Sequence, residues 1–325
     1  MNNPYLIIDG GTSNTRFYLL SGDQVIDTQV AHVGAASAVG QGSNPELVQA
    51  VRKVIRVFEE THECRIRQVF ASGMITSPTG LHEVPHLSAP VGLNDLAQNM
   101  MSVVLPVISD EITFHFVPGV KALEQATSLT EIVRGEETEV MGLLEALPEV
   151  GTDAKVLHFG SHHKLIQVQN NKISAITSTL TGELFWAVRN HTILRSSLAS
   201  STDYGLAPAY VLYGFRAAET DGLSRALFTA RLQDLFADAS INEVASYVYG
   251  AMVQGDVMAF ANKGALRSSE PLILYGRNAF IRAFLLCIDT EDRDVHTLSY
   301  EESEQLSLRG MLRIVETLEK DGVAQ

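Results

Sequence analysis

Short apolar runs separated by polar turns open the chain. Residues 5–8 are an aliphatic run that ends in Asp9, and a glycine-rich turn leads to a second apolar run at 16–20. A third run, at 24–33, follows the next turn. Runs of this length between turn residues predict β-strands. The pattern therefore predicts a hairpin and a third strand, with a tight polar turn directly after Asp9.

The same order of elements recurs in the second half of the chain. Three apolar runs between residues 155 and 179 predict strands, and the turn between the first two begins at Gly160. The stretch 148–153, which contains proline and glycine, is the best candidate for a boundary. We therefore expect two domains of related topology, an N-terminal one at 1–150 and a C-terminal one at 151–325.

Helical periodicity dominates the segments between these strands. After Asn44 and Pro45, which suit the cap and first turn of a helix, apolar residues recur on one stripe up to Phe58. Similar stripes predict helices at 136–147, 183–194, 223–235, 241–260, 279–288 and 301–319. Further strands are expected at 68–71, 114–118 and 271–275, with a long irregular loop at 72–90. Together these elements predict an α/β fold.

Composition and charge narrow the class of function. Hydrophobic residues make up 46% and charged residues 19% of the 325 residues, as in globular proteins that bury a core. The formal net charge of −14 would repel a phosphate-rich polymer, so nucleic acid is not an expected partner. We find no leader sequence, no apolar run long enough to span a membrane, and no metal-binding spacing around Cys64 and Cys287. We therefore expect a cytoplasmic protein without membrane association, and the sequence leaves a homodimer open.

The turn after Asp9 carries the most informative chemistry. Gly11, Thr12 and Ser13 offer successive N–H groups and hydroxyls, which suit a phosphate-binding turn. Asp9 at a strand end suits Mg²⁺ held through water, and Arg16 suits the charge of a transferred phosphoryl group. An ordinary hairpin turn with a capping aspartate is the alternative. The chain contains neither GxxxxGK[ST] nor GxGxxG before a helix, which argues against a P-loop and a Rossmann site.

A second candidate phosphate turn lies at the matching place in the C-terminal half. Gly160, Ser161, His162 and Lys164 supply small residues and polar groups there. Two such turns, facing each other, could hold a polyphosphate, and this pairing is the central prediction about the nucleotide site. A zinc site at the three histidines of this region is the weaker alternative, because strand alternation places their side chains on different faces.

Acidic residues at helix starts are candidates for proton transfer and substrate binding. Glu136 and Glu137 lie in the first helical turn after Arg134, where the helix dipole favours the ionised carboxylate. An ionised carboxylate suits the base that activates a hydroxyl, and the alternative is a stabilising charge without a chemical role. Thr181 is expected to cap another helix, with Glu183 in its first turn.

Several motifs occur together and in a fixed order. They are Ile8-Asp9-Gly10-Gly11-Thr12-Ser13-Asn14-Thr15-Arg16, Ser72-Gly73-Met74, Val117-Pro118-Gly119, Val133-Arg134-Gly135-Glu136-Glu137-Thr138-Glu139 and Leu180-Thr181-Gly182-Glu183-Leu184. In this order they resemble the 2-dehydro-3-deoxygalactonokinase family, which belongs to the sugar kinase, hexokinase and actin-like superfamily. The Arg-Gly-Glu-Glu-Thr block is the most specific of them, and the resemblance extends over residues 5–283.

The resemblance implies a fold and an activity. The fold would be α/β, with two actin-like (ribonuclease H-like) lobes around a central cleft. The activity would be transfer of the γ-phosphoryl group of ATP, with Mg²⁺, to the 6-hydroxyl of 2-dehydro-3-deoxy-D-galactonate or a closely related sugar acid. This reaction is a step of galactonate degradation. Glu137 would be the first choice for the catalytic base and Glu136 the second, with Arg16 also catalytic.

Motif positions and the resemblance together also assign binding roles. Contacts with the nucleotide are expected from Gly11, Thr12, Ser13, Gly160, Ser161, His162, Lys164 and Gly276. Contacts with the sugar acid are expected from Asn14, Gly73, Met74, Arg134 and Glu183.

The chain also departs from the family pattern. Gly10 stands where a bulky aromatic is usual, and the second phosphate turn lacks the usual Pro-Gly-Thr-His-x-Lys-Trp sequence. Arg277 follows Gly276 where a pair of small residues is usual. Because most changes lie on the nucleotide side, one alternative is a catalytically degenerate regulatory protein of the same fold that binds a sugar acid. A phosphatase or ATPase on this fold is another.

Overall fold

The computed structural model describes residues 3–38, 44–123, 128–198, 205–262, 266, 269–291, 293–320 and 322. Contacts within the chain divide it into two compact units. Unit 1 comprises Met1–Thr152, Gln169–Ala175 and Glu304–Gln325, and unit 2 comprises Asp153–Val168 and Ile176–Ser303. The C-terminal segment therefore packs with the N-terminal part of the chain.

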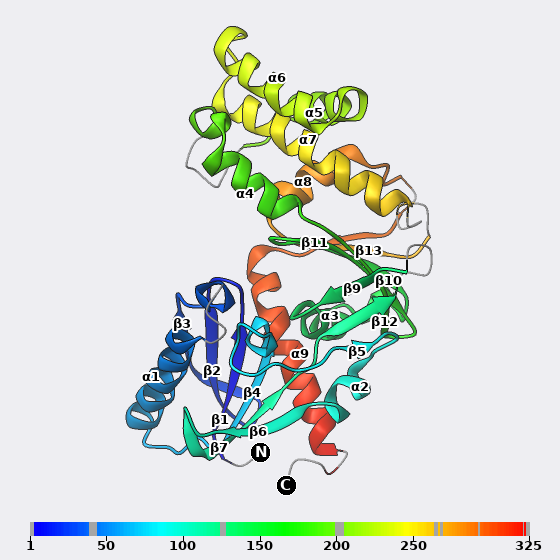
Figure 1. Ribbon diagram of the computed structural model, residues 1–325. Helices are drawn as coiled ribbons and strands as arrows, with labels where there is room; N and C mark the ends of the chain where they lie inside the picture. Colours follow the sequence, from blue (N-terminus) through cyan, green and yellow to red (C-terminus); the bar gives the residue numbers. More distant parts are fainter. Residues whose placement is uncertain are drawn as a thin grey trace. The chain divides into compact units, whose positions relative to one another are not determined.

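A six-stranded mixed sheet is the framework of unit 1, in the order β3-β2-β1-β4-β7-β6 (Figure 1). Its strands are β1 (Tyr5–Gly10), β2 (Thr15–Ser21), β3 (Gln24–Ala31), β4 (Gln68–Gly73), β6 (Met101–Leu105) and β7 (Ser109–Phe116). The predicted hairpin and third strand are confirmed. β1 is parallel to β4, and its last residues, Asp9 and Gly10, lie opposite Ser72 and Gly73. The carboxyl ends of β1 and β4 therefore meet at one edge of the sheet.

Helix α1 (Pro45–Thr61) packs its apolar stripe against residues of β1, β2 and β4. Asn44 caps the helix as predicted, because its side-chain oxygen accepts a hydrogen bond of 3.0 Å from the N–H of Leu47. Pro45 occupies the first helical turn, where its missing N–H costs no hydrogen bond. The periodicity of this segment therefore identified both the helix and its buried face.

Helices α3 (Glu136–Ala146) and α9 (Tyr300–Lys320) approach each other closely within unit 1. A Cβ added at Gly142 would lie 2.2 Å from the carbonyl oxygen of Leu306, and one at Gly310 would lie 1.8 Å from that of Thr138. Only glycine permits this approach of one backbone to another. Both helices match predicted segments, and the contact fixes the start of α3 in unit 1.

A small sheet and a short helix in unit 1 were not predicted. The sheet has the order β5-β8-β9 and consists of β5 (Leu87–Ser88), β8 (Val120–Leu123) and β9 (Thr130–Val133), and the helix is α2 (Leu93–Gln98). These elements are too short to show a clear period in the sequence. The predicted loop at 72–90 contains a 3-10 turn, Met74–Thr76, and β5 at its end.

The sheet of unit 2 repeats the arrangement of the first one, in the order β12-β11-β10-β13-β14. Its strands are β10 (Ala154–Phe159), β11 (His163–Gln169), β12 (Lys172–Thr179), β13 (Leu272–Gly276) and β14 (Val295–Thr297). As in unit 1, the first strand is antiparallel to the second and parallel to the strand on its other side. The predicted recurrence of strand, turn, strand, turn and strand is confirmed.

Helices supply most of the remaining core of unit 2. They are α4 (Thr181–His191), α5 (Pro208–Asp221), α6 (Leu223–Phe236), α7 (Ile241–Asn262) and α8 (Asn278–Cys287). The pattern missed α5, which packs closely on α7 through Gly214 and Gly250 (Figure 1). Within the described ranges, no helix has both the length and the apolar character needed to cross a lipid bilayer.

The close α5–α7 contact predicts opposite effects for two substitutions in one helix. A Cβ at Gly250 would lie 1.9 Å from the carbonyl oxygen of Val211, so Gly250→Ala is expected to lower the free energy of unfolding by about 1–3 kcal/mol. A Cβ at Gly255 meets nothing within 4 Å, so Gly255→Ala is expected to raise it by about 0.5–1 kcal/mol. Denaturant unfolding followed by circular dichroism measures both. Equal changes in the free energy of unfolding for the two variants would contradict the close contact between α5 and α7 at Gly250.

Candidate active site

In the turn after β1, residues 11–14, backbone carbonyl groups accept the hydrogen bonds that fix its conformation. The N–H of Gly11 donates to the carbonyl of Asn14 (2.9 Å), and the carbonyls of Gly11 and Thr12 accept from Ala35 and Ala36 at 3.2 and 2.9 Å. Thr12, Ser13 and Asn14 are exposed. Among the described residues, the N–H groups of Thr12 and Ser13 have no hydrogen-bond partner. The turn thus presents free amide donors to solvent, as an anion-binding turn does.

Asp9 and Arg16 face each other at the mouth of this turn. Their side chains approach to 3.7 Å, and Arg16 also donates a hydrogen bond of 2.5 Å to Glu304 of α9. Burial raises the pKa of the Asp9 carboxyl, while Arg16 and a hydrogen bond from Ser307 act in the opposite direction. The sequence predicted roles for Asp9 and Arg16 but missed Glu304 and Ser307, because they lie almost 300 positions away on α9.

Three glycines bring the strand ends and the start of α3 together. A Cβ at Gly10 would lie 2.5 Å from the Cβ of Ile75, which explains why this chain has no bulky residue there. Gly73 has φ of +85° and would place a Cβ 2.5 Å from the carbonyl oxygen of Gly10. Gly135 has φ of +115° and would place one 3.3 Å from Cα of Gly73. The start of α3 therefore adjoins the ends of β1 and β4.

Glu137 is fully buried at this junction. Its Oε2 accepts a hydrogen bond of 2.7 Å from the N–H of Gly135. Burial, and then the charge of Glu136, raise its pKa to about 8, although backbone N–H groups and Arg134 act in the opposite direction. The expectation that the helix dipole keeps Glu137 ionised was wrong, because desolvation outweighs the dipole.

The second oxygen of Glu137 is one of several buried polar atoms of unit 1 that have no hydrogen-bond partner in the described residues. Within the described part of the chain, Oε1 of Glu137, Oγ of Ser72 and Oγ1 of Thr138 are buried and have no hydrogen-bond partner. Ser72 precedes Gly73, and Thr138 follows Glu137 in α3. Unsatisfied buried polar atoms in a native fold call for a specific explanation, and a bound polar ligand is one.

Arg134 ties the start of α3 to the predicted substrate loop. Its guanidinium donates to the carbonyls of Thr76 (2.6 Å) and Val84 (2.9 Å), to the Thr76 hydroxyl, and lies 3.2 Å from the ring nitrogens of His86. Burial, and then the charges of Arg134 and Lys121, lower the pKa of His86 to about 4. Arg134 thus holds the loop that begins at Gly73 and Met74.

The second candidate turn, at residues 160–162, is built like the first. The carbonyl of Ser161 accepts a hydrogen bond of 2.7 Å from the N–H of Glu183, and a Cβ at Gly182 would lie 2.1 Å from the carbonyl of Gly160. His162 reaches Glu183 at 2.9 Å. No N–H of residues 160–162 bonds to another residue that the structure describes. In both turns, the carbonyls are engaged and the amides are left free.

The structure corrects the expectation for Thr181 and shows the surroundings of Lys164 and Gly276. Thr181 does not cap α4, because Leu180 is the N-cap and the Thr181 hydroxyl donates to Asp256 at 2.6 Å. The ammonium group of Lys164 donates to the hydroxyl of Ser178 at 2.9 Å. Gly276 has φ of +107° and passes the end of β10, where a Cβ would lie 2.7 Å from the carbonyl of Phe159.

The histidines near the second turn have separate partners. His158 stacks on Tyr275, His162 contacts Glu183, and His163 is buried with its Nδ1 2.7 Å from Asp256. No cluster of three or more His, Cys, Asp or Glu side chains suited to a metal ion occurs in the described residues. In the described structure, each of the three rings is thus engaged by a different neighbour.

Asp256 is the main residue of unit 2 that the sequence analysis missed. It lies near the end of α7, is fully buried, and accepts hydrogen bonds from two threonines besides its contact with His163. The available signal was an acidic residue within the mostly apolar stretch 244–260, because buried carboxylates occur mainly where donors surround them.

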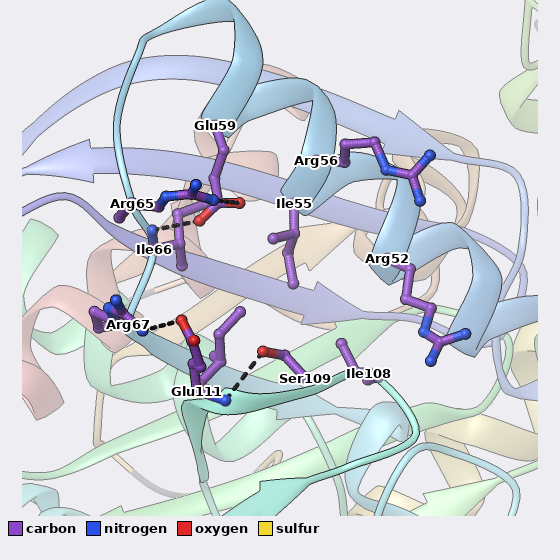
Figure 2. Close-up of a pocket in the computed structure, with 11 residues that line it drawn as sticks. Arg52, Ile55, Arg56, Glu59, Arg65, Ile66, Arg67, Ile108, Ser109 and Glu111 are labelled. Carbon is purple, nitrogen blue, oxygen red and sulfur yellow. Dashed lines mark hydrogen bonds and ion pairs between the residues drawn. The ribbon is translucent and has the colours of Figure 1, made fainter.

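A surface hollow of about 400 Å³ lies elsewhere on unit 1, beside α1 (Figure 2). Figure 2 shows Arg65 paired with Glu59 and Arg67 paired with Glu111, while Arg52 and Arg56 project from α1. None of the predicted site residues lines this hollow. The candidate residues of the two turns and of the Glu137 junction therefore lie outside this hollow.

Comparison with protein families settles the identity at the family level. The model of the family described as 2-keto-3-deoxy-galactonokinase matches residues 9–314. The chain belongs to the 2-keto-3-deoxy-galactonokinase family. It is a sugar kinase, a phosphotransferase whose acceptor is an alcohol group, and the resemblance carried by the sequence motifs is confirmed.

Individual relatives of this kinase agree with the family match. The 2-dehydro-3-deoxygalactonokinase of Escherichia coli (strain K12) is 24% identical over 275 residues, which cover 84% of this chain and 86% of the relative. DgoK1 of Rhizobium meliloti (strain 1021), named provisionally for the same activity, is 22% identical over 321 residues, or 96% and 97% of the two chains.

Solved structures confirm the fold of this kinase. A crystal structure from Sinorhizobium meliloti, named provisionally as a 2-dehydro-3-deoxygalactonokinase, has a TM-score of 0.76 at 19% identity and covers 96% of this chain and 99% of that one. The activator of 2-hydroxyisocaproyl-CoA dehydratase from Clostridium difficile, with bound ADPNP, has a TM-score of 0.50 at 11% identity and covers 99% and 98%. The predicted actin-like α/β fold is confirmed.

The buried carboxyl of Glu137 predicts a pH-dependent stability. Its pKa rises from 4.5 to about 8 on folding, so the folded state retains a proton that the unfolded chain loses in this window. The free energy of unfolding should therefore fall as pH rises from 4.5 to about 8 and level off above it. Glu137→Gln removes this titration and should flatten that part of the curve.

Denaturant unfolding at a series of pH values measures this difference. Glu145→Gln, at an exposed position of the same helix, is the matched control and should keep the slope of the unmodified chain. Parallel curves for the unmodified chain and Glu137→Gln would show that Glu137 is not the titrating group.

Proposed function

We propose that this kinase transfers the γ-phosphoryl group of ATP to the 6-hydroxyl of 2-dehydro-3-deoxy-D-galactonate or a closely related sugar acid. The observation that carries the proposal is the carboxyl of Glu137, which is buried where β1 and β4 end. One of its oxygens is fixed by the N–H of Gly135, and the other has no partner among the described residues. That free oxygen is placed to accept the proton of a substrate hydroxyl.

Glu137 would act as the general base. As the hydroxyl oxygen bonds to the γ-phosphorus and the bond to ADP breaks, the hydroxyl proton passes to Oε1 of Glu137. A base acts best when its pKa lies near the working pH, and the pKa of Glu137 is raised to about 8. Roughly a tenth of the carboxyl is ionised at pH 7 with that pKa, so turnover should gain from alkaline pH.

The turn after β1 would bind phosphate through its free amides. Among the described residues, the N–H groups of Thr12 and Ser13 take no part in the hydrogen bonds that hold the turn, and Gly11 adds no side chain there. Asp9 supplies one carboxylate beside this turn, and a single carboxylate suits Mg²⁺, which keeps most of its water shell. Bound Mg²⁺ would offset the negative charge of the phosphates. Arg16 would offset the negative charge of the phosphoryl group during its transfer.

In unit 2, the turn of Gly160, Ser161 and His162 would bind nucleotide phosphates. Its amides are free of partners in the described structure, and Lys164 adds a cation two residues beyond. Gly276 would allow the adenosine to approach the end of β13, because no side chain projects there.

Sugar-acid contacts would come from the loop that Arg134 holds. The guanidinium of Arg134 is occupied by Thr76 and Val84, so its part is to position Gly73 and Met74 beside Glu137. Asn14 is exposed on the first turn, with its side chain 3.0 Å from His32. Glu183 remains a proposed contact, although it pairs with His162 in unit 2.

Activity assays test the proposal directly. ADP release should be measured with a panel of aldonic and 2-keto-3-deoxy acids, and the phosphorylated product should be identified. Release of phosphate without a phosphorylated sugar would indicate an ATPase. Binding of a sugar acid without any turnover would indicate the regulatory alternative. Either result would overturn the proposed function.

Glu137→Gln should lower kcat by about 10²–10⁴-fold, because the hydroxyl then loses its proton acceptor. Glu136→Gln is the matched control: Glu136 is only partly buried and accepts a hydrogen bond from the N–H of Arg134, so its loss should have a much smaller effect. Full turnover in Glu137→Gln would remove Glu137 from the mechanism.

The pH profile gives an independent test of the same base. In the unmodified kinase, kcat should rise with pH and level off above about 8, because the base acts in its ionised form. The residual activity of Glu137→Gln should lack this rise. A flat profile in the unmodified enzyme between pH ~6 and ~9 would contradict the assignment.

A further inference from the structure

A buried carboxylate lies beneath the second phosphate turn. Asp256 of α7 is fully buried, and its two oxygens divide their contacts. Oδ1 accepts hydrogen bonds from the hydroxyls of Thr179 (2.5 Å) and Thr181 (2.6 Å), and Oδ2 lies 2.7 Å from Nδ1 of His163. Each oxygen of this carboxyl therefore has at least one polar partner.

The three partners of Asp256 lie on three different elements of unit 2. His163 is the first residue of β11 and directly follows the turn of residues 160–162. Thr179 ends β12, and Thr181 begins α4. Asp256 thereby links the strand that leaves the turn to the helix that packs against it.

The first residues of α4 fix the backbone conformation of residues 160–162. The N–H of Glu183 donates to the carbonyl of Ser161, and Gly182 leaves room for the carbonyl of Gly160. With these two carbonyls directed at α4, the amides of the turn remain free. A shift of Thr181 would move Gly182 and Glu183, and with them both carbonyls.

Stability alone is a poor explanation for Asp256. Removing a carboxylate from water costs several kcal/mol, and a well-packed apolar residue often serves a core as well or better. What the carboxylate supplies is a fixed distance between three polar side chains on three elements. That geometry matters where a backbone turn has to fit a charged ligand closely.

We propose that Asp256 is a positioning residue for nucleotide binding, which sets the turn of residues 160–162 through Thr181 and His163. It does not touch the nucleotide. The proposal rests on the proposed function in that the ligand of this turn is taken to be the phosphates of ATP or ADP.

The test combines kinetics with direct binding. Asp256→Asn keeps the shape but cannot accept from all three donors, so KM for MgATP and Kd for MgADP by calorimetry should rise about ten-fold or more. KM for the sugar acid should change less than KM for MgATP, because all of its proposed contacts except Glu183 lie in unit 1. Unchanged nucleotide affinity in Asp256→Asn would overturn the proposal.

Thr181 provides a paired test if Asp256→Asn folds poorly. Thr181→Val keeps the shape and loses the hydroxyl, so it should weaken nucleotide binding, and Thr181→Ser should restore it. Ser246→Ala in α7 is the control for stability, since Ser246 bonds Ala207 and Asn242 and not the turn. A lower melting temperature with unchanged nucleotide affinity in Thr181→Val would show a purely structural role.

The two proposals fail in different ways. If the unmodified protein binds MgADP but phosphorylates no sugar acid, the proposed function fails, while weaker binding in Asp256→Asn still supports the positioning role. If the unmodified protein is an active kinase and Asp256→Asn keeps its nucleotide affinity, the positioning role alone fails. Absence of both nucleotide binding and turnover in the unmodified protein overturns both.

Discussion

Close approach of the backbone at the ends of β1 and β4 is the constraint on which unit 1 depends. Gly10, Gly73 and Gly135 each lie where a Cβ would meet a neighbouring atom at 2.5–3.3 Å. Because these positions lack side chains, the first turn of α3 can adjoin two strand ends. Glu137 is carried into the interior by this contact, and its unusual pKa follows from that burial.

The buried carboxyl groups of Asp256 and Glu137 differ in their hydrogen-bond partners. Asp256 contacts three polar side chains on three elements, and this arrangement holds those side chains in place. Glu137 has only backbone N–H donors, and its Oε1 has no hydrogen-bond partner in the described residues. Burial, and then the charge of Glu136, raise the pKa of this carboxyl to about 8. The two buried acids therefore differ in the polar groups that surround them, and the roles proposed for them differ accordingly.

Much of the fold could be predicted from periodicity. The stripe of α1 and the repeated hairpins at β1–β2 and β10–β11 were found because their apolar residues recur at a constant period. Elements such as α5 and β9 were missed. Gly214 interrupts the apolar pattern of α5, yet it is the residue that lets α7 pack against it, and β9 is only four residues long. For α5, packing on α7 compensates for the weak local signal, and for β9 the pairing with β8 does so.

The sequence by itself determined which groups could do chemistry: the turn after Asp9, the turn at Gly160 and the acidic start of α3 are local motifs, readable from neighbouring residues. Only the tertiary structure decided the state of those groups. Glu304 joins Arg16, Asp256 joins His163, and Glu137 loses its water through contacts between residues far apart in the chain. The reason is physical: backbone turns depend on adjacent residues, whereas desolvation and charge pairing depend on everything that surrounds a side chain in space.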